Sequence, residues 1–254
     1  MDLGLTDRHL VVTGGTAGLG LAVARVLVEE GARVTVASRD PARVEAAAAE
    51  LGAAGVVVDL TAPDASTRLL DAAEAANGPL HGGFVSHGGP PPGPATELDD
   101  ARLDAALAGS VLAPVRVVRD LVARLDDGGA VAVLTSMTSV QPIAGLASSN
   151  VARPAVWGYV KALADEVAPR GVRVNVVLPG RFATERLAEL EADVAEREGT
   201  TPAAVRAEAV ARVPLRRLGD PAELGRVAAF LLSPAASYVT GSAWAVDGGA
   251  VRGL

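Results

Sequence analysis

Short valine-rich segments alternate with helix-forming segments along the whole chain, and this alternation restricts the fold more than any other feature. The apolar segments read HLVVTGG, RVTVASR, GVVVDL, GGFVSHGG, GAVAVLTS, GVRVNVVLPG and SAWAVDGG. A stretch with helical spacing follows each of the first six. Strands separated by helices form βαβ units, whose parallel sheet is covered by helices on both faces. The sequence therefore predicts an α/β fold with a doubly wound parallel sheet.

The helical segments have recognisable ends. One of them, PARVEAAAAELGA, begins with Pro41 and closes with Gly52, as helices often do. Further helices are predicted over 63–77, 97–125, 149–169, 184–212 and 221–232. Linkers, repeats and low-complexity tracts are lacking, so we expect residues 1–254 to form a single domain.

Composition excludes several classes of protein. The chain has 254 residues, of which 50% are hydrophobic, and it carries a net charge of −7 without a basic block. These values favour a large core and argue against nucleic acid as a partner. Cysteine is absent, which rules out disulfides and thiolate metal sites; no metal site is predicted. With no signal peptide and no apolar run of about 20 residues, we expect a cytoplasmic protein that does not enter the membrane and acts on a small molecule.

The turn after the first strand reads TGGTAGLG and opens a helix. Its Gly14, Gly18 and Gly20 allow a tight turn, and the helix N-terminus offers free N–H groups to an anion. We predict a dinucleotide-binding site here, with Thr16 and Leu19 as further contacts. The alternative is a structural turn, since turns need glycine anyway.

The ends of the second and third strands bear on which dinucleotide binds. An acidic residue after the second strand would favour NAD, but this chain has Ser38 and Arg39, which can bind a 2′-phosphate. We therefore predict NADP(H) in preference to NAD(H); the alternative is a surface arginine that precedes a helix. Asp59 and Leu60, at the end of the third strand, are candidates for the adenine contact.

The order and spacing of these pieces resemble the short-chain dehydrogenase/reductase (SDR) family over essentially the full length. The matching segments include TGGTAGLG, VVVDLT, GAVAVLTSMTS, APRGVRVNVVLPGRFATER, PLRRLGDPAELGRVAAFLLS and SYVTGSAWAVDGG. The resemblance implies a Rossmann-like sheet of about seven strands and a nicotinamide cofactor. It also implies a substrate lid at about 184–212 and a homo-oligomer, most commonly a tetramer, in which the helices 97–125 and 149–169 pair.

The family's usual catalytic set is Asn, Ser, Tyr and Lys, and here most of it is altered. The serine position falls on Ser136, the tyrosine position on Ser149, the lysine position on Arg153 and the asparagine position on Ala106. This pattern resembles a divergent branch, often labelled 3-oxoacyl-ACP-reductase-like, in which SNxxR replaces YxxxK. We take Ser136, Ser149, Asn150 and Arg153 as the candidate catalytic residues.

The tyrosine and lysine that the helix 149–169 does contain have the wrong spacing. Tyr159 lies ten residues beyond Ser149, so it points about 80° away from the Ser149 face. We expect Tyr159 to pack in the core or at a subunit contact, and Lys161 to be solvated. Pro154 lacks an N–H, so the helix is expected either to begin near Arg153 or to bend there.

The replacement residues differ in what chemistry they can do. Arg153 can donate to a ribose hydroxyl but cannot release a proton near neutral pH. Asn150 can orient a carbonyl without protonating it. His87, after the fourth strand, is the nearby residue with a suitable ordinary pKa, and with Gly88 it is also expected beside the cofactor. The alternative for His87 is a hydrogen-bonded histidine at the edge of the core.

The loop PGRFATER follows the sixth strand. The resemblance implies cofactor contacts there from Pro179, Gly180, Phe182 and Thr184. Arg181 and Arg186, together with Arg153, can bind an anionic substrate; the alternative is a solvated surface paired with acidic residues.

Three functions are compatible with this sequence. The first is an NADP(H)-binding SDR-type oxidoreductase whose proton donor is water, the substrate or His87. The second is a lyase, isomerase or cyclase in which Ser136 and Arg153 polarise a carbonyl. The third is a cofactor-binding protein without catalysis. The glycine turn supports cofactor binding in all three.

Overall fold

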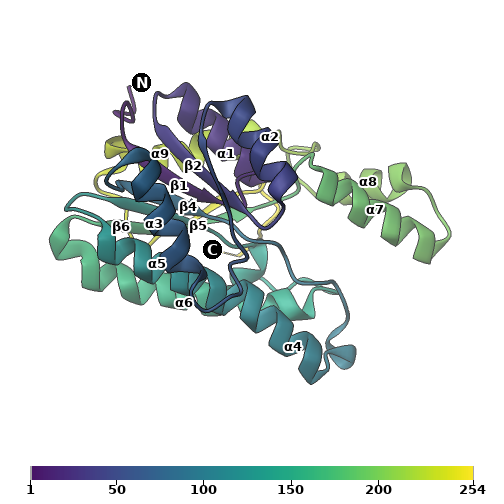
Figure 1. The fold of residues 1–254 in the computed structure, drawn as a ribbon. Helices are drawn as coiled ribbons and strands as arrows, with labels where there is room; N and C mark the ends of the chain where they lie inside the picture. Colours follow the sequence, from purple (N-terminus) through teal and green to yellow (C-terminus); the bar gives the residue numbers. More distant parts are fainter. Residues whose placement is uncertain (1, 254) are drawn as a thin grey trace.

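A computed structural model describes residues 2–253 and contains one parallel sheet of seven strands in the order β3-β2-β1-β4-β5-β6-β7 (Figure 1). The strands are β1 (His9–Thr13), β2 (Arg33–Ser38), β3 (Ala54–Val57), β4 (Gly82–Val85), β5 (Ala130–Leu134), β6 (Arg173–Pro179) and β7 (Ala243–Val246). Each strand pairs in parallel with its neighbours. The predicted α/β fold with a doubly wound parallel sheet is therefore confirmed.

Helices cover both faces of the sheet, which divides the core into two layers. One layer packs α1 (Gly18–Glu29), α2 (Pro41–Leu51) and α9 (Pro221–Leu232) on the sheet. The other packs α3 (Ala65–Asn77), α5 (Ala113–Arg124) and α6 (Ala147–Val167). Figure 1 shows these two groups of helices on opposite sides of the strands. Valine, leucine and alanine fill both layers, since the chain has few aromatic residues.

The segment 97–125 contains a long helix, as predicted, but a π-helical turn interrupts it. Following a short 3₁₀ turn (Ala95–Glu97), it comprises α4 (Asp100–Leu107), a π-helical turn (Ala108–Leu112) and α5. Pro114 at the start of α5 has no N–H for the Ser110 carbonyl, so the regular hydrogen-bond ladder is interrupted there. The π-helical turn packs against α6, which places an irregular backbone beside the helix that carries the altered residues.

Helix α6 runs from Ala147 to Val167 with Pro154 inside it. The expectation that the helix begins near Arg153 is therefore wrong. Because Pro154 cannot donate to the Asn150 carbonyl, the helix lacks one bond in this turn but continues through it. Ser149 and Arg153 consequently share one helical face, one turn apart.

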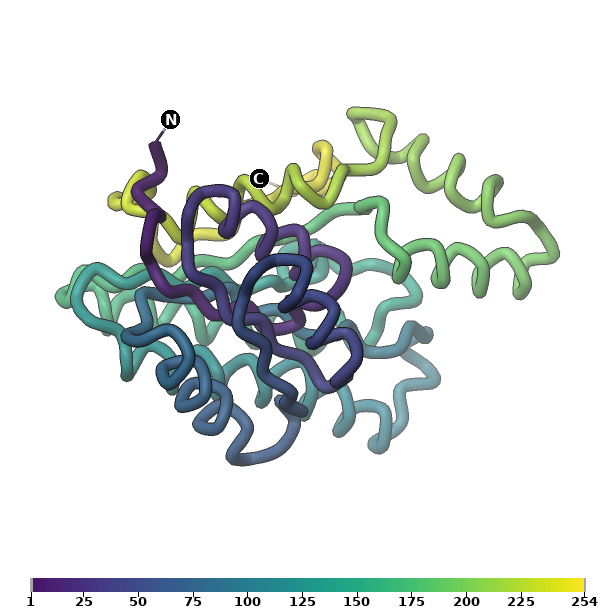
Figure 2. The backbone as a smooth tube through the Cα atoms, turned by 45° about the horizontal axis from the view of Figure 1, so that its top comes forward, coloured from purple at the N-terminus to yellow at the C-terminus, as the bar shows by residue number. Residues whose placement is uncertain are grey.

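The two helices α7 (Glu185–Glu198) and α8 (Pro202–Ala211) form an arm that projects from the body of the protein. Figures 1 and 2 show this arm and α4 projecting at the same end of the molecule. Glu191 is buried between the two helices and pairs with Arg206 at 2.7 Å. The predicted helical content of 184–212 is confirmed. Within residues 2–253, no helix is both long and apolar enough to span a bilayer.

Candidate functional site

The site begins where β1 and β4 lie side by side in the middle of the sheet. From β1 the chain continues to β2 on one side, whereas β4 is followed by β5 on the other. In open α/β sheets, ligands bind beyond the carboxyl ends of the strands at such a switch point. The Thr13 hydroxyl donates to the Ser86 carbonyl at 2.7 Å and accepts from the Ser86 N–H at 2.9 Å. This pair of bonds fixes the two strand ends that flank the crevice.

The predicted glycine turn lies at this crevice. Gly14 and Gly18 have φ of +59° and +53°, values that favour glycine. A Cβ atom on Gly20 would overlap the Gly14 carbonyl, whereas at Gly18 the nearest side-chain atom would be 3.8 Å away, on Thr184. The turn is thus tight on its inner side and open on its outer side, as the approach of a pyrophosphate requires.

The N-terminus of α1 is open to an anion. Ala17 provides no side-chain cap, and the first turn of α1 contains no acidic residue. A hollow of about 460 Å³ adjoins the turn; its lining includes Thr16, Gly18 and Thr184. Thr184 caps α7 by accepting from the Leu187 N–H at 3.3 Å, so the start of the projecting arm lies against the glycine turn.

The ends of β2 and β3 meet at Ser38 and Val57 in the paired register. The Arg39 side chain is exposed, and no acidic group of residues 2–253 lies within 4 Å of its charge. The Asp59 carboxylate accepts from the Thr61 N–H at 3.0 Å and from the Thr61 hydroxyl at 2.8 Å. These bonds lower the pKa of Asp59, and the charge of Arg39 acts in the same direction. A free guanidinium at this position fits a 2′-phosphate.

Ser136 and Ser149 are connected through a residue that sequence reasoning missed. The Ser136 hydroxyl accepts from the Thr138 N–H at 3.2 Å, and the Thr138 hydroxyl lies 2.9 Å from the Ser149 hydroxyl. Both serines are half-buried, while Thr138 is buried. The signal for Thr138 was its place two residues after Ser136, where a short turn brings it against α6. Two hydroxyls and their connector therefore line the end of β5.

Asn150 has a different set of partners from those expected. Its side-chain oxygen accepts from the Ile143 N–H at 3.0 Å, and its amide nitrogen donates to the Ile143 carbonyl at 2.9 Å. These two hydrogen bonds fix the loop before α6 to the first turn of the helix. Its predicted role toward a carbonyl finds no support in this arrangement.

Arg153 is buried, with 6% of its surface exposed. Its Nη1 donates to the Leu134 carbonyl at 3.3 Å and lies 3.2 Å from the His87 Nε2 atom. Burial lowers the pKa of the guanidinium to about 10, so the group remains charged at neutral pH. Arg153 therefore joins the end of β5 to the residue after β4.

His87 is held neutral, which favours the predicted alternative of a hydrogen-bonded histidine at the edge of the core over a proton donor. Burial and the neighbouring charge of Arg153 lower the pKa of His87 to about 3. Its Nδ1 atom lies 3.2 Å from the Gly88 carbonyl, to which it donates, so Nε2 is the atom that accepts from Arg153. A neutral imidazole of this kind is not a proton donor at neutral pH.

The remaining candidates lie as follows. Ala106 is buried in α4, while Ser110 lies in the π-helical turn, also buried and next to α6. Sequence reasoning missed Ser110, although π-helical turns are frequent at functional sites. Tyr159 packs against the core, as expected. Lys161 is exposed, but its amine also donates to the Gly241 carbonyl at 3.0 Å.

The loop after β6 supports the crevice from the other side. Phe182 is buried against Gly219, so only its backbone can face a ligand. A Cβ on Gly180 would lie 2.5 Å from the Asp247 Cα atom, which explains the glycine. Arg181 is exposed, and Arg186 pairs with Glu189 at 3.4 Å on the arm.

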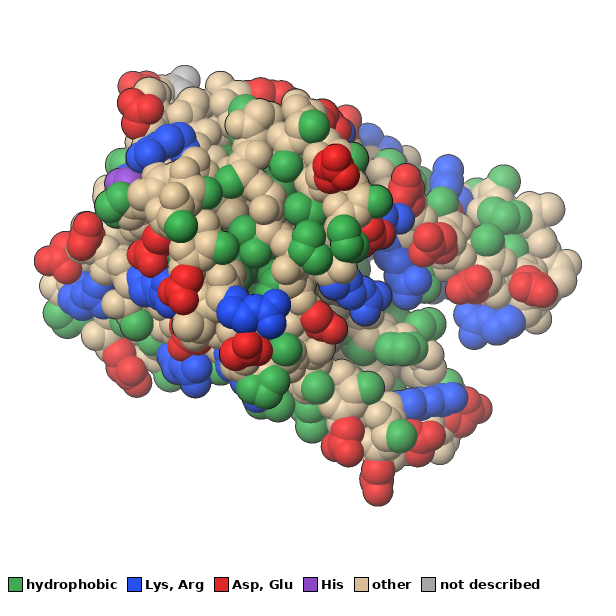
Figure 3. Space-filling model, in the orientation of Figure 1, with side chains coloured by type: hydrophobic (Ala, Val, Ile, Leu, Met, Phe, Trp, Pro, Cys, Tyr) green, Lys and Arg blue, Asp and Glu red, His purple; other side chains and the backbone are tan. Residues whose placement is uncertain are grey.

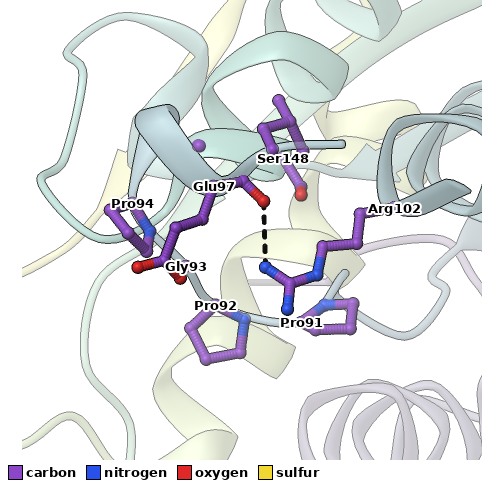
Figure 4. Close-up of a pocket in the computed structure, with 9 residues that line it drawn as sticks. Pro91, Pro92, Gly93, Pro94, Glu97, Arg102 and Ser148 are labelled. Atoms are coloured by element: carbon purple, nitrogen blue, oxygen red, sulfur yellow. Dashed lines mark hydrogen bonds between the residues drawn. The ribbon is translucent and has the colours of Figure 1, made fainter. Parts of the chain in front are cut away.

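A second cavity, near α4, is too small for a substrate. It measures about 10 Å³, which is room for about one water, and Arg102 and Ser148 are among its lining residues. Figure 4 shows Arg102 reaching across it to the Glu97 carbonyl, to which it donates at 3.0 Å. Residues 2–253 contain no cluster of three acidic or histidine side chains arranged for a metal ion.

Sequence comparisons place this chain among dehydrogenases and reductases. A family profile described as "Enoyl-(Acyl carrier protein) reductase" matches residues 14–251. The chain is 34% identical to dehydrogenase/reductase SDR family member 4 of Oryctolagus cuniculus, over 97% of this chain and 94% of that protein. It is 38% identical to galactitol 2-dehydrogenase (L-tagatose-forming) of Cereibacter sphaeroides, over 94% of this chain and 92% of that protein.

Solved structures agree with the sequence comparisons. L-sorbose reductase from Gluconobacter frateurii, complexed with NADPH and L-sorbose, superposes with a TM-score of 0.95 at 28% identity, and the match covers 100% of both chains. Actinorhodin polyketide ketoreductase with NADPH gives a TM-score of 0.90 at 28% identity, over 96% of this chain and 97% of that chain.

Proposed function

We propose that this chain, which belongs to the short-chain dehydrogenase/reductase family, is an NADP(H)-dependent oxidoreductase with an atypical catalytic set. The observation that carries the proposal is the glycine turn at the switch point of the sheet, with an uncapped helix N-terminus behind it. The relatives are dehydrogenases and reductases, and two of the similar structures contain NADPH. The preference for NADP(H) rests on Arg39, whose exposed side chain has no acidic partner within 4 Å among residues 2–253.

The residues present fit such a cofactor. The glycine turn and the first N–H groups of α1 would bind its pyrophosphate, Ser38 and Arg39 its 2′-phosphate, and Asp59 its adenosine. The backbone of His87 and Gly88 and the loop from Pro179 to Thr184 would flank the nicotinamide half. When bound, this cofactor supplies or accepts a hydride at a substrate carbon.

The substrate side of the proposal rests on hydroxyl groups. Ser136 and Ser149 would orient a carbonyl or alcohol oxygen, with Thr138 holding the Ser149 hydroxyl in place. Neither serine has a neighbouring base in its hydrogen-bond network, and His87 is neutral. The proton therefore comes from water or from the substrate itself. This set matches the SNxxR pattern of the divergent branch.

A second candidate function follows from the same observation. Without a proton donor of near-neutral pKa, the protein would bind the cofactor and turn over slowly or not at all, or would polarise a carbonyl for a non-redox step. Ser136 and Arg153 are the residues that such a lyase, isomerase or cyclase would use.

Calorimetric titration with NADPH and with NADH tests the proposal directly. We expect NADPH to bind more tightly, and a panel of ketones and alcohols to show cofactor-dependent turnover. Tight NADPH binding without turnover across the panel would favour the second candidate. Failure of both nucleotides to bind would refute the proposal.

We also propose a homotetramer in the cytoplasm. The support is the family resemblance together with partly buried apolar residues of α6, such as Trp157 and Leu163. Light scattering should give four times the monomer mass of 25.5 kDa; a monomer at micromolar concentration would contradict this.

A further inference from the structure

Arg153 uses only part of its hydrogen-bonding capacity. Nη1 donates to Leu134 and contacts His87, but Nε is enclosed and has no partner in the part of the chain that the structure describes. Nη2 also makes no hydrogen bond to residues 2–253; unlike Nε, it is not enclosed, and it lies 4.0 Å from the position of a Cβ on Gly89. Nη2 is therefore the donor of Arg153 that a ligand can reach, and a guanidinium N–H forms a strong charge-assisted hydrogen bond with a carboxylate oxygen.

The charge of Arg153 has no counter-ion. No acidic side chain among residues 2–253 lies within 4 Å of its guanidinium, and its neighbours are a neutral imidazole and a carbonyl. A buried charge is ordinarily paired, because burial alone costs several kcal/mol. An anion supplied by a ligand would provide the missing partner.

We infer that Nη2 of Arg153 binds a substrate carboxylate, so that the substrates of the proposed oxidoreductase are small oxo acids and hydroxy acids. The inference rests on the proposed function and names the substrate class of that site. Ser149 lies one helical turn before Arg153 on the same face of α6, so its hydroxyl would face the carbonyl adjoining such a carboxylate. Gly88 and Gly89, both exposed, leave the approach to Nη2 free of side chains.

The shape of the surface is compatible with this assignment. Figure 3 shows a hollow between the projecting arm and the region of α4, with basic side chains along its edge. Arg181 and Arg186 are exposed on the loop and the arm that border it. A basic border of this kind steers small anions toward a cleft.

The test compares an oxo acid with its uncharged ester. Benzoylformate and methyl benzoylformate carry the same reacting carbonyl, and only the first carries a carboxylate. Binding to the protein saturated with NADPH is followed by tryptophan fluorescence at constant ionic strength. A hydrogen bond between charged groups corresponds to roughly 10- to 100-fold in affinity, so we expect the acid to bind more tightly than the ester by about that factor.

Three variants test whether Arg153 causes the preference for the acid over the ester. Arg153→Gln should bring the acid and the ester to similar affinities. Arg153→Lys keeps the charge but lacks the Nη2 group, so it should retain only part of the preference. Arg68→Gln removes an arginine with 57% of its side chain exposed, which pairs with Asp64 on α3; it is the matched control and should keep the full preference.

The outcomes separate this inference from the proposed function. Equal affinities of the wild type for acid and ester overturn the inference, and this comparison decides even where Arg153→Gln fails to fold. An unchanged acid-to-ester ratio in a folded Arg153→Gln, together with weaker NADPH binding, would show that Arg153 binds the cofactor. That outcome would overturn the inference as well. Failure of NADPH to bind refutes the proposed function, and the ratio measured without cofactor then still decides the anion site.

Discussion

Two arginines of this chain are buried to almost the same degree, and they are used in opposite ways. Arg153 is 6% exposed and Arg173 is 7% exposed. Burial lowers the pKa of both guanidinium groups, and neither has an acidic partner among residues 2–253. Arg173 donates from Nη1 and Nη2 to the carbonyls of Leu231, Ser233 and Val239, at 2.8 to 3.3 Å.

The comparison distinguishes an arginine whose hydrogen bonds stabilise the fold from one that has donors available for a ligand. Arg173 lies at the amino end of β6, where it fastens the end of α9 and the following loop to the sheet. Arg153 lies at the carboxyl ends of the strands, where ligands bind in this fold. Its Nε and Nη2 atoms have no hydrogen-bond partner among residues 2–253. Equal burial thus says little about role; the satisfaction of each donor and its place on the sheet say more.

The largest effect is expected from restoring the family's tyrosine and lysine at Ser149 and Arg153. Ser149→Tyr with Arg153→Lys supplies a general acid and the lysine that lowers its pKa. A positioned general acid is worth about 10²- to 10⁴-fold in rate, or about 3–5 kcal/mol of barrier. Turnover of simple ketones with NADPH should rise accordingly, measured as kcat/KM from the loss of NADPH absorbance.

The single variants serve as controls for this gain. Arg153→Ala alone should weaken NADPH binding if its guanidinium also reaches the ribose, and Ser136→Ala should slow turnover only if a carbonyl is bound beside it. Vigorous reduction of ordinary ketones by the wild type, insensitive to both substitutions, would place the chemistry elsewhere. In that event His87 is the next residue to mutate.

The two arginines should differ next in their effect on stability. Arg173→Met removes three hydrogen bonds, so we expect the free energy of unfolding to fall by about 2–4 kcal/mol. The Val239 carbonyl keeps the bond from Asn175, and the Ser233 carbonyl keeps the bond from the Ala236 N–H. Arg153→Met removes a buried charge that lacks a counter-ion, and stability should change by no more than about 1 kcal/mol, in either direction. Urea unfolding measures both values; similar losses for the two variants would abolish the distinction.

The sheet was predictable because parallel strands buried on both faces read as valine-rich runs between helices. The positions of Gly14, Gly18 and Gly20 followed from the same logic, since each lies where the backbone turns or is closely packed. The helix over 221–232 agrees with the bounds of α9, because Asp220 and Pro221 mark its start clearly. Local chemistry decides these features, so the local sequence reveals them.

The site was less predictable where contacts join distant parts of the chain. The pKa of His87 depends on Arg153, 66 residues away, and on burial that no local pattern encodes. Thr138 was missed because its importance comes from its hydrogen bond to Ser149 on α6. Asn150 was expected to face a substrate, but the oxygen and the nitrogen of its side-chain amide both bond to the backbone of Ile143.

A third prediction concerns the exposed arginine of the cofactor site. Arg39 has no acidic partner in the described chain, like Arg153, but it is open to solvent. Arg39→Ala should weaken NADPH binding by about 1.5–3 kcal/mol, the range for a hydrogen bond to a charged group, and leave NADH binding nearly unchanged. Calorimetry on both nucleotides gives the values. Equal affinities of the wild type for NADPH and NADH would remove the basis of this prediction.

The smallest effect is expected at the histidines, which also lie at opposite ends of the sheet. His87 lies at the ligand edge, whereas His9 is fully buried at the opposite end of the sheet. There the His9 Nδ1 atom donates to the Gly78 carbonyl at 2.9 Å, and Nε2 accepts from the Thr35 hydroxyl at 2.9 Å. Burial lowers the pKa of His9, and the charge of Arg33 acts in the same direction.

Since the folded pKa of His9 lies below its unfolded value of about 6.5, the unfolded state binds more protons in this window. The neutral imidazole therefore contributes full stability above about pH 6.5, and this contribution is lost as the pH falls toward the folded pKa. His9→Gln keeps a donor and an acceptor but does not titrate, so its free energy of unfolding should decline less between pH 7 and pH 5. His81→Gln and His87→Gln control for the other two histidines, whose pKa values are lowered as well. If wild type and His9→Gln decline in parallel in urea unfolding, the buried imidazole is not the group that senses pH.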